Sequence, residues 1–263
     1  MYDYHVHTDF SDDGFASISE IIDTAIEKGI KEIAITDHYD PDYPDPDFPF
    51  DINFISYHNA LLKAEREYKD RIKILKGIEI GIQHGETLIK CEKAANAFPY
   101  DIVLGSFHTI CGDDLYSNYF TNRNAEEGVR DYYVYMADCL KIYKNFDILG
   151  HINVIDRYAG HVPDYSPYME IIESILRMLI ENGKGIETNA SGAWYGMGER
   201  TMPSKEILKL YKDLGGEIIT IGSDAHKVSQ IGYGYNAAVE SLKSHGFKYI
   251  CTFEGRKHKF VKI

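Results

Sequence analysis

Residues 72–80 read Ile-Lys-Ile-Leu-Lys-Gly-Ile-Glu-Ile, a short run rich in β-branched side chains that predicts a strand. Similar short runs recur along the chain at residues 2–7, 32–36, 101–105, 147–151, 185–188 and 217–221. Helical patterns lie between these runs, and alternating strands and helices predict a parallel sheet with right-handed crossovers. We therefore expect an α/β fold in which the strands close, or nearly close, into a (β/α) barrel. A doubly wound open sheet is the alternative.

The segments between the strands show the spacing of amphipathic helices. Ile18, Ile21 and Ile22 fall on one helix face, and Ser17 with Glu20 three residues later predicts a capping box at its start. Further helices are expected at residues 54–69, 86–97, 125–144, 204–214 and 237–244, and one begins at Met169. The last residues, 249–253 and 259–263, predict a closing hairpin around the turn Glu254-Gly255-Arg256. The proline-rich residues 40–51 predict a long loop over the site face.

Length and composition predict a single acidic domain spanning residues 1–263. Lys and Arg number 28 against 41 Asp and Glu, which gives a net charge of −13 and disfavours a nucleic-acid-binding surface. The apolar runs are short and interrupted by charges, so we expect no membrane span. The first residues form a strand-like run, so we expect no secretory signal. The four cysteines are far apart and fit free thiols in the cytoplasm.

Imidazole and carboxylate side chains gather at the ends of the expected strands. His5 and His7 lie two positions apart in the first run, so they face the same side. Glu79 interrupts a run that is otherwise largely apolar. The remaining groups follow directly after strands and are Asp37, His38, His108, His151, Asp224 and His226. The strand ends of a barrel converge, so we expect these groups to lie together.

Such a collection of polar groups suggests metal binding. Burying many imidazoles and carboxylates costs a great deal of free energy unless they share protons or metal ions. Imidazole and carboxylate ligands without thiolates suit zinc, manganese or iron, and this number of ligands suits more than one ion. The sequence therefore predicts a polynuclear metal site.

The motifs around these residues follow one another in a recognisable order. They are His5-Val6-His7-Thr8, Thr36-Asp37-His38, Gly77-Ile78-Glu79, Gly105-Ser106-Phe107-His108, Gly150-His151 and Gly222-Ser223-Asp224-Ala225-His226. This set resembles the PHP (polymerase and histidinol phosphatase) superfamily over nearly the whole chain. Residues 150–158, 187–192, 202–204 and 223–227 resemble its histidinol-phosphatase branch in particular.

The resemblance implies a distorted (β/α)7 TIM-like barrel that holds three divalent metal ions at the C-terminal ends of its strands. The first ion would be held by His5, His7, Glu79 and Asp224. The second would be held by Glu79, which bridges the two, with His108 and His151. The third would be held by His38, His226 and a residue after the first motif. Similar proteins often have a histidine before a glycine there, whereas this chain has Asp12 and Asp13 before Gly14; Asp13 fits by spacing, and Asp12 is the alternative.

The implied activity is metal-assisted hydrolysis of a small phosphomonoester, with Glu79, Asp224 and His226 as catalytic residues. Asp224 or His226 would pass a proton to the leaving alkoxide. Arg157 and Arg200 are the candidates for binding the phosphate, because a guanidinium offers paired donors. The acidic residues of the 40–51 loop would suit a substrate ammonium group.

The resemblance to the histidinol-phosphatase branch makes histidinol-phosphate phosphatase, a step of histidine biosynthesis, the leading hypothesis. The alternative is a PHP phosphoesterase that acts on nucleotides or another small phosphorylated metabolite, or a proofreading-type nuclease. A non-catalytic metal-binding module is disfavoured because every metal position is filled.

Overall fold

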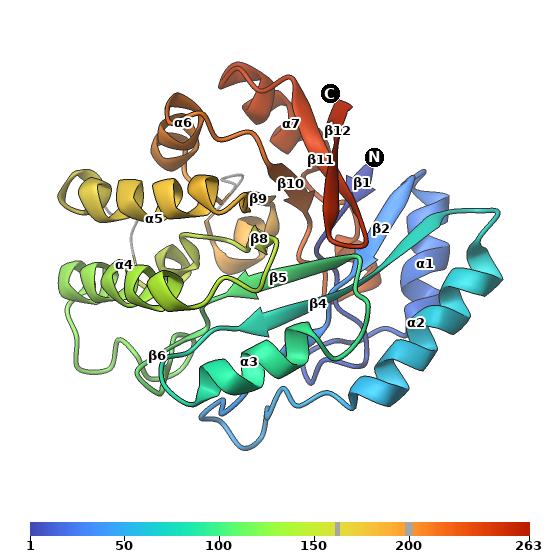
Figure 1. The fold of residues 1–263 in the computed structure, drawn as a ribbon, viewed down its shortest axis with the longest axis horizontal. Helices are drawn as coiled ribbons and strands as arrows, with labels where there is room; N and C mark the ends of the chain where they lie inside the picture. The colour runs from blue at the N-terminus through green and yellow to red at the C-terminus, as the bar shows by residue number, and fades with distance from the viewer. Residues whose placement is uncertain (161–163, 198–201) are drawn as a thin grey trace.

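The computed structural model describes residues 1–160, 164–197 and 202–263, and a parallel sheet runs through its centre (Figure 1). The sheet follows the order β1 (Tyr2–Asp3), β2 (Glu32–Ile35), β4 (Lys73–Gly81), β5 (Ile102–Ser106), β8 (Ile148–Leu149), β9 (Gly185–Asn189) and β10 (Ile219–Gly222). The short strand β3 (His38–Tyr39) pairs with β4 outside this path.

The two ends of this strand order meet. The backbone N–H of Tyr4 donates to Ile221 at 3.0 Å, that of Asp224 to His5 at 2.9 Å, and that of His7 to Ala225 at 2.8 Å. The sheet is therefore a nearly closed, distorted (β/α)7 barrel, which confirms the predicted fold class, and the doubly wound open sheet is wrong. The predicted strand of residues 2–7 is regular only at Tyr2–Asp3, which form β1. Beyond Asp3 the backbone still bonds to residues 221–225, but in an irregular pattern.

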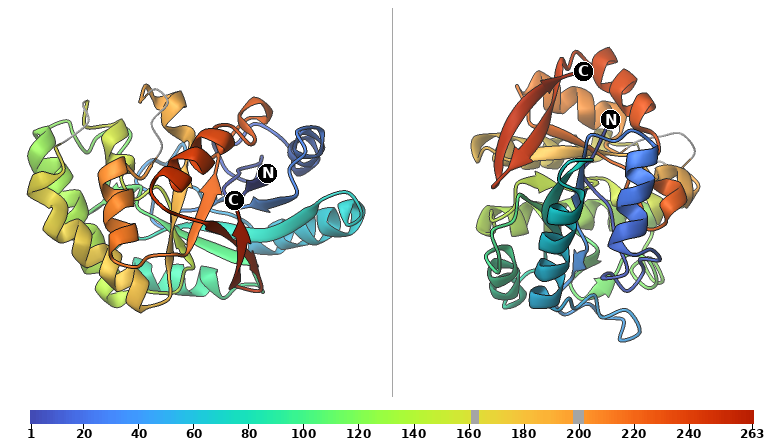
Figure 2. Two further views of the ribbon diagram at one scale, coloured as in Figure 1. Left: turned by 90° about the horizontal axis from the view of Figure 1, so that it is seen from above. Right: turned by 90° about the vertical axis from the view of Figure 1, so that its right-hand side faces the viewer.

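Helices surround the strands in both figures (Figures 1 and 2). They are α1 (Ile18–Glu27), α2 (Phe54–Tyr68), α3 (Thr87–Ala95), α4 (Ala125–Ile142), α5 (Met169–Glu181), α6 (Lys205–Asp213) and α7 (Tyr235–Ser244). The capping box of Ser17 and Glu20 is confirmed at the start of α1. Among the described residues, no helix combines the length and the apolar character that crossing a bilayer requires.

Short elements complete the face of the barrel that carries the strand C-termini. Turns of 3-10 helix follow β8, precede α5 and follow β9 and β10: η1 (Val154–Arg157), η2 (Ser166–Tyr168), η3 (Ser191–Tyr195) and η4 (Val228–Gln230). A small hairpin of β6 (Thr109–Ile110) and β7 (Asp113–Asp114) was not predicted, because its strands have only two residues each and show no periodicity.

The predicted C-terminal hairpin, β11 (Tyr249–Glu254) and β12 (Lys257–Lys262), is confirmed and packs against the strands near β10 (Figure 1). Its Cys251 and Phe253 share one apolar cluster with inward-facing strand residues, namely Tyr4, Ala34, Leu75, Ile102, Leu104 and Ile148. The backbone N–H of Phe253 also donates to the hydroxyl of Tyr4 at 3.2 Å. The hairpin therefore closes the N-terminal end of the barrel, and polar groups are left for the opposite end.

Replacing Phe253 by alanine tests this closure. Phe253 is 3% exposed, so Phe253→Ala leaves a cavity, and we expect the free energy of unfolding to fall by about 3 to 5 kcal/mol. Phe260, on the partner strand, is 47% exposed, and Phe260→Ala serves as the matched control with an expected change of at most about 0.5 kcal/mol. Urea unfolding of both variants measures the difference, and equal losses would contradict the role of the hairpin.

Candidate metal centre

The barrel brings the predicted site residues together because parallel strands end at one face. His5 and His7 follow β1, His38 opens β3, and Glu79 lies near the end of β4. The others follow later strands: His108 after β5, His151 after β8, and Asp224 with His226 after β10. The pairing of β3 with β4 sets His38 directly beside Glu79.

Glu79 is the centre of this group. Its side chain is fully buried in the C-terminal half of β4, between Ile78 and Ile80. Imidazole nitrogens of five histidines lie 3.1–3.5 Å from its two oxygens, with His5, His7 and His38 around Oε2 and His108 and His151 around Oε1. Ser106 donates a hydrogen bond of 2.5 Å to Oε1. A single carboxylate thus faces imidazoles from four segments of the chain, as a bridging ligand requires.

Asp224 lies on the other side of the first two histidines. Its Oδ1 is 3.6 Å from His5 Nε2 and 3.3 Å from His7 Nε2. Its backbone has a φ of +55°, a conformation that is strained for a residue with a side chain. The hydrogen bond from its N–H to the carbonyl of His5 helps to hold it there.

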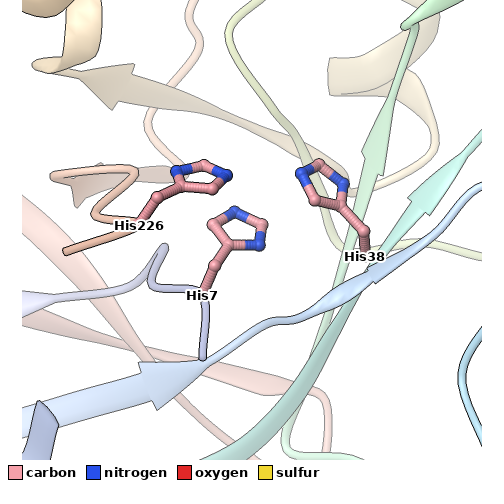
Figure 3. A group of neighbouring side chains, drawn as sticks. All are labelled: His7, His38 and His226. Atoms are coloured by element: carbon pink, nitrogen blue, oxygen red, sulfur yellow. The ribbon is translucent and has the colours of Figure 1, made fainter. Parts of the chain in front are cut away.

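A second group of imidazoles consists of His7, His38 and His226 (Figure 3). The ring of His7 lies between those of His38 and His226, with centroid distances of 4.2 and 4.1 Å, and the three rings turn towards one another. Asp13 Oδ2 is 3.2 Å from His226 Nε2 and 4.0 Å from His38 Nε2. Asp12 instead accepts the backbone N–H of Phe50 at 2.7 Å, so of the two alternatives Asp13 faces the imidazoles.

These residues fit divalent cations. Several of their buried atoms lack a hydrogen-bond partner within the described part of the chain: His5 Nε2, His7 Nε2, His38 Nδ1, Asp13 Oδ1 and Glu79 Oε2. A buried polar atom without a partner costs about 1 to 3 kcal/mol. The three imidazole nitrogens lie 3.1–3.4 Å from Glu79 Oε2. Their ligand atoms form groups within 4.8 Å: His5 with His7 and Asp224, His5 with Glu79 and His151, and His7 with His38 and His226. Cations between them would satisfy all of these atoms.

Burial and neighbouring charges shift the pKa values of Glu79 and His5 in opposite directions. Burial raises the pKa of Glu79, but the charges of His5, His38 and His108 outweigh this effect and hold it well below its ordinary value. Burial lowers the pKa of His5, and Glu187, Glu79 and Asp224 outweigh that effect and raise it well above its ordinary value.

His7 shows the opposite shift from His5. Burial comes first among the causes, and the charges of His226 and His38 on either side add to it, so the pKa of His7 falls to about 3. The neutral imidazole that results is the form that binds metal ions.

Two residues of the site were missed by the sequence analysis. Glu187 Oε1 lies 2.8 Å from His5 Nδ1, and Asp40 Oδ2 lies 2.5 Å from His108 Nδ1. With His38 and His108, Asp40 forms a further group of ligand atoms. Glu187 is a charged residue inside a buried strand. The same signal identified Glu79 in the sequence. Asp40 belongs to the proline-rich loop, where nothing local distinguishes it from its acidic neighbours.

Of the two arginines predicted to bind phosphate, Arg157 reaches the centre. Its Nη2 lies 3.0 Å from Asp224 Oδ2 and also donates to the hydroxyl of Ser191. Its guanidinium lies 4.2 Å from the ring centroid of Tyr195. Arg200 lies outside the described residues.

Comparisons with known proteins give a family and several similar phosphatases. A family model described as "PHP domain" matches residues 3–191. A "Probable histidinol-phosphatase" of Clostridium acetobutylicum is 33% identical, covering 99% of this chain and 100% of the relative. One of Thermotoga maritima is 32% identical, covering 100% of both chains. The crystal structure of histidinol phosphate phosphatase from Lactococcus lactis, complexed with zinc, L-histidinol and phosphate, has a TM-score of 0.87 and 27% identity, covering 98% of both chains.

Binding of zinc to the metal-free protein is expected to release protons at pH 7. Burial lowers the pKa of His38, but Glu79 and Asp13 outweigh it and raise this pKa to about 9, and the pKa values of His5 and His108 are raised as well. These imidazoles are protonated below their raised pKa values and must become neutral to bind zinc. Zinc affinity should therefore rise about tenfold per pH unit for each proton released, up to about pH 9.

Calorimetric zinc titrations at pH 7, in two buffers of different ionisation enthalpy, count these protons. Fewer protons should be released at pH 8.5 than at pH 7. Zinc uptake at pH 7 without proton release would contradict the assignment of these charged imidazoles as ligands.

Proposed function

The chain belongs to the PHP domain family, in its histidinol-phosphatase branch, and we propose that it is a metal-dependent phosphatase that hydrolyses L-histidinol phosphate to L-histidinol and phosphate. The observation that carries the proposal is the buried Glu79 carboxylate, which faces five imidazoles at the strand ends. The zinc, L-histidinol and phosphate of the Lactococcus lactis relative support this substrate. The four unpaired cysteines fit a cytoplasmic location.

The proposed centre holds three divalent ions, with zinc as the first choice and manganese or iron as the alternatives. The ligands of the first ion are His5, His7, Glu79 and Asp224. Those of the second are Glu79, His108 and His151, and those of the third are His38, His226 and Asp13. The distances of Asp13 to the two imidazoles support it over Asp12 as the last ligand.

When bound, the ions would polarise the phosphoryl oxygens and lower the pKa of water from 15.7 to about 7. Arg157 would bind a phosphoryl oxygen, because its buried Nε has no hydrogen-bond partner in the described part of the chain and its Nη2 already reaches Asp224. The leaving alkoxide would receive its proton through Asp224 or His226. The carbonyl of Asp224 lies 3.0 Å from His226 Nδ1, which fixes a proton there and turns Nε2 towards Asp13.

Phosphate release from a substrate panel tests the function. We expect the zinc-loaded protein to hydrolyse L-histidinol phosphate with a kcat/KM at least about 100-fold above that for nucleoside monophosphates and a phosphodiester, since a site that pairs with polar substrate groups discriminates by such factors. A chelator should abolish the activity, and added zinc should restore it. Equal rates on all substrates would refute the histidinol-phosphate assignment, and hydrolysis that resists chelation would refute the metal mechanism.

Two neighbouring aspartates test the third metal position. Asp13→Asn removes a carboxylate that faces two imidazoles, so we expect it to lower the metal content of the dialysed protein by one ion per chain. Asp12→Asn changes a residue whose carboxylate accepts the backbone N–H of Phe50 and should keep the full metal content. Elemental analysis of both proteins measures the difference. The reverse result would assign the site to Asp12.

A further inference from the structure

We propose that Glu187 is a positioning residue that joins the ligands of the first two metal sites through one buried carboxylate. It would act through His5 and the start of the loop that carries His151, without binding metal or substrate itself. This inference rests on the metal centre of the proposed function and adds to it a residue that the ligand sets do not contain.

Both oxygens of Glu187 are occupied by donors of the protein. Its Oε1 accepts from His5 Nδ1 at 2.8 Å, and its Oε2 accepts the backbone N–H of His151 and the side-chain amide of Asn189, each at 3.0 Å. The residue is 1% exposed, so water does not compete for these bonds. Glu187 is absent from the groups of potential ligand atoms in the described chain. Its carboxylate therefore faces ligand-bearing segments rather than the space between the ligands.

The neighbouring strand β10 leaves room for this carboxylate by ending in glycine. A Cβ added to Gly222 would lie 2.1 Å from Glu187 Oε1 and 2.5 Å from the Cβ of His5. A side chain at position 222 would thus expel the carboxylate from its place. The position of the Glu187 carboxylate is therefore set by the packing of the barrel and by three hydrogen bonds.

The hydrogen bond to His5 determines how this imidazole meets a metal ion. A carboxylate at Nδ1 keeps the proton on that nitrogen, so the lone pair of Nε2 points to Glu79 and Asp224. The same carboxylate raises the basicity of the ring, which strengthens its bond to a cation. The amide of Asn189 also lies 3.4 Å from Asp224 Oδ2. Glu187 therefore contacts His5 directly and Asp224 through Asn189, both ligands of the first ion, and it contacts the backbone of His151, a ligand of the second.

Two variants and a matched control test the proposal. Glu187→Gln keeps the shape of the side chain and removes its charge, and Glu187→Asp keeps the charge and shortens the reach. Either change should weaken the binding of the tightest zinc ion by about 10- to 100-fold, as measured by competition with a fluorescent chelator. Glu217→Gln alters an exposed glutamate two residues before β10 and should leave the zinc affinity unchanged.

Cobalt substitution separates positioning from simple stabilisation. The visible absorption of Co²⁺ reports ligand geometry, so the Glu187 variants should show a shifted spectrum while the metal-free chains keep the wild-type circular dichroism. Zinc affinity within twofold of wild type together with an unchanged cobalt spectrum would overturn the role of Glu187 and leave the proposed function intact. A wild-type chain that binds no zinc would overturn both. If neither variant folds without metal, Glu187 holds the fold itself and the positioning role is wrong.

Discussion

The arrangement of the site depends on one cluster of buried carboxylates and imidazoles. The carboxylates of Glu79 and Asp224 are buried. Imidazoles from several strand ends lie within 4 Å of them. Such a group is costly in a protein interior, because each charge loses its hydration, and the cost falls only when opposite charges or cations meet it. The positions of the strand ends, the glycines beside the strands and the hydrogen bonds around the centre all follow from the need to hold these groups at short distances.

Buried carboxylates outside the proposed ligand sets supply much of this support. Asp37 accepts the N–H of Thr8 at 2.6 Å and the hydroxyl of Ser11 at 2.9 Å, which ties the loop of Asp13 to the end of β2. Asp3 accepts the N–H of Ser223 at 2.9 Å and so holds the residue before Asp224. The strained backbone at Asp224 is thus fixed from both sides, which is how a barrel can present a ligand in a conformation that an isolated loop would leave.

One end of the barrel is apolar and contributes stability, and the other end carries the polar groups of the site. The C-terminal hairpin fills the N-terminal end with apolar side chains, and Arg256 in its turn pairs with Asp147 at 2.9 Å. Apolar burial at that end contributes free energy that offsets the cost of the polar groups at the other end. The proposed metal ligands therefore occupy the end where loops leave the strands and a substrate can enter.

The sequence by itself determined the elements and the ligand types. Alternating patterns predicted the barrel strands and helices, the Ser17 capping box and the C-terminal hairpin, because these features depend on residues close together in the chain. Motifs at strand ends likewise predicted the histidines around Glu79. The tertiary structure alone decided that Asp13 rather than Asp12 faces them, that Arg157 pairs with Asp224, and that Glu187 meets His5 from 182 positions away. Such contacts depend on the closure of the barrel, which sets distant segments side by side and leaves no trace in local periodicity.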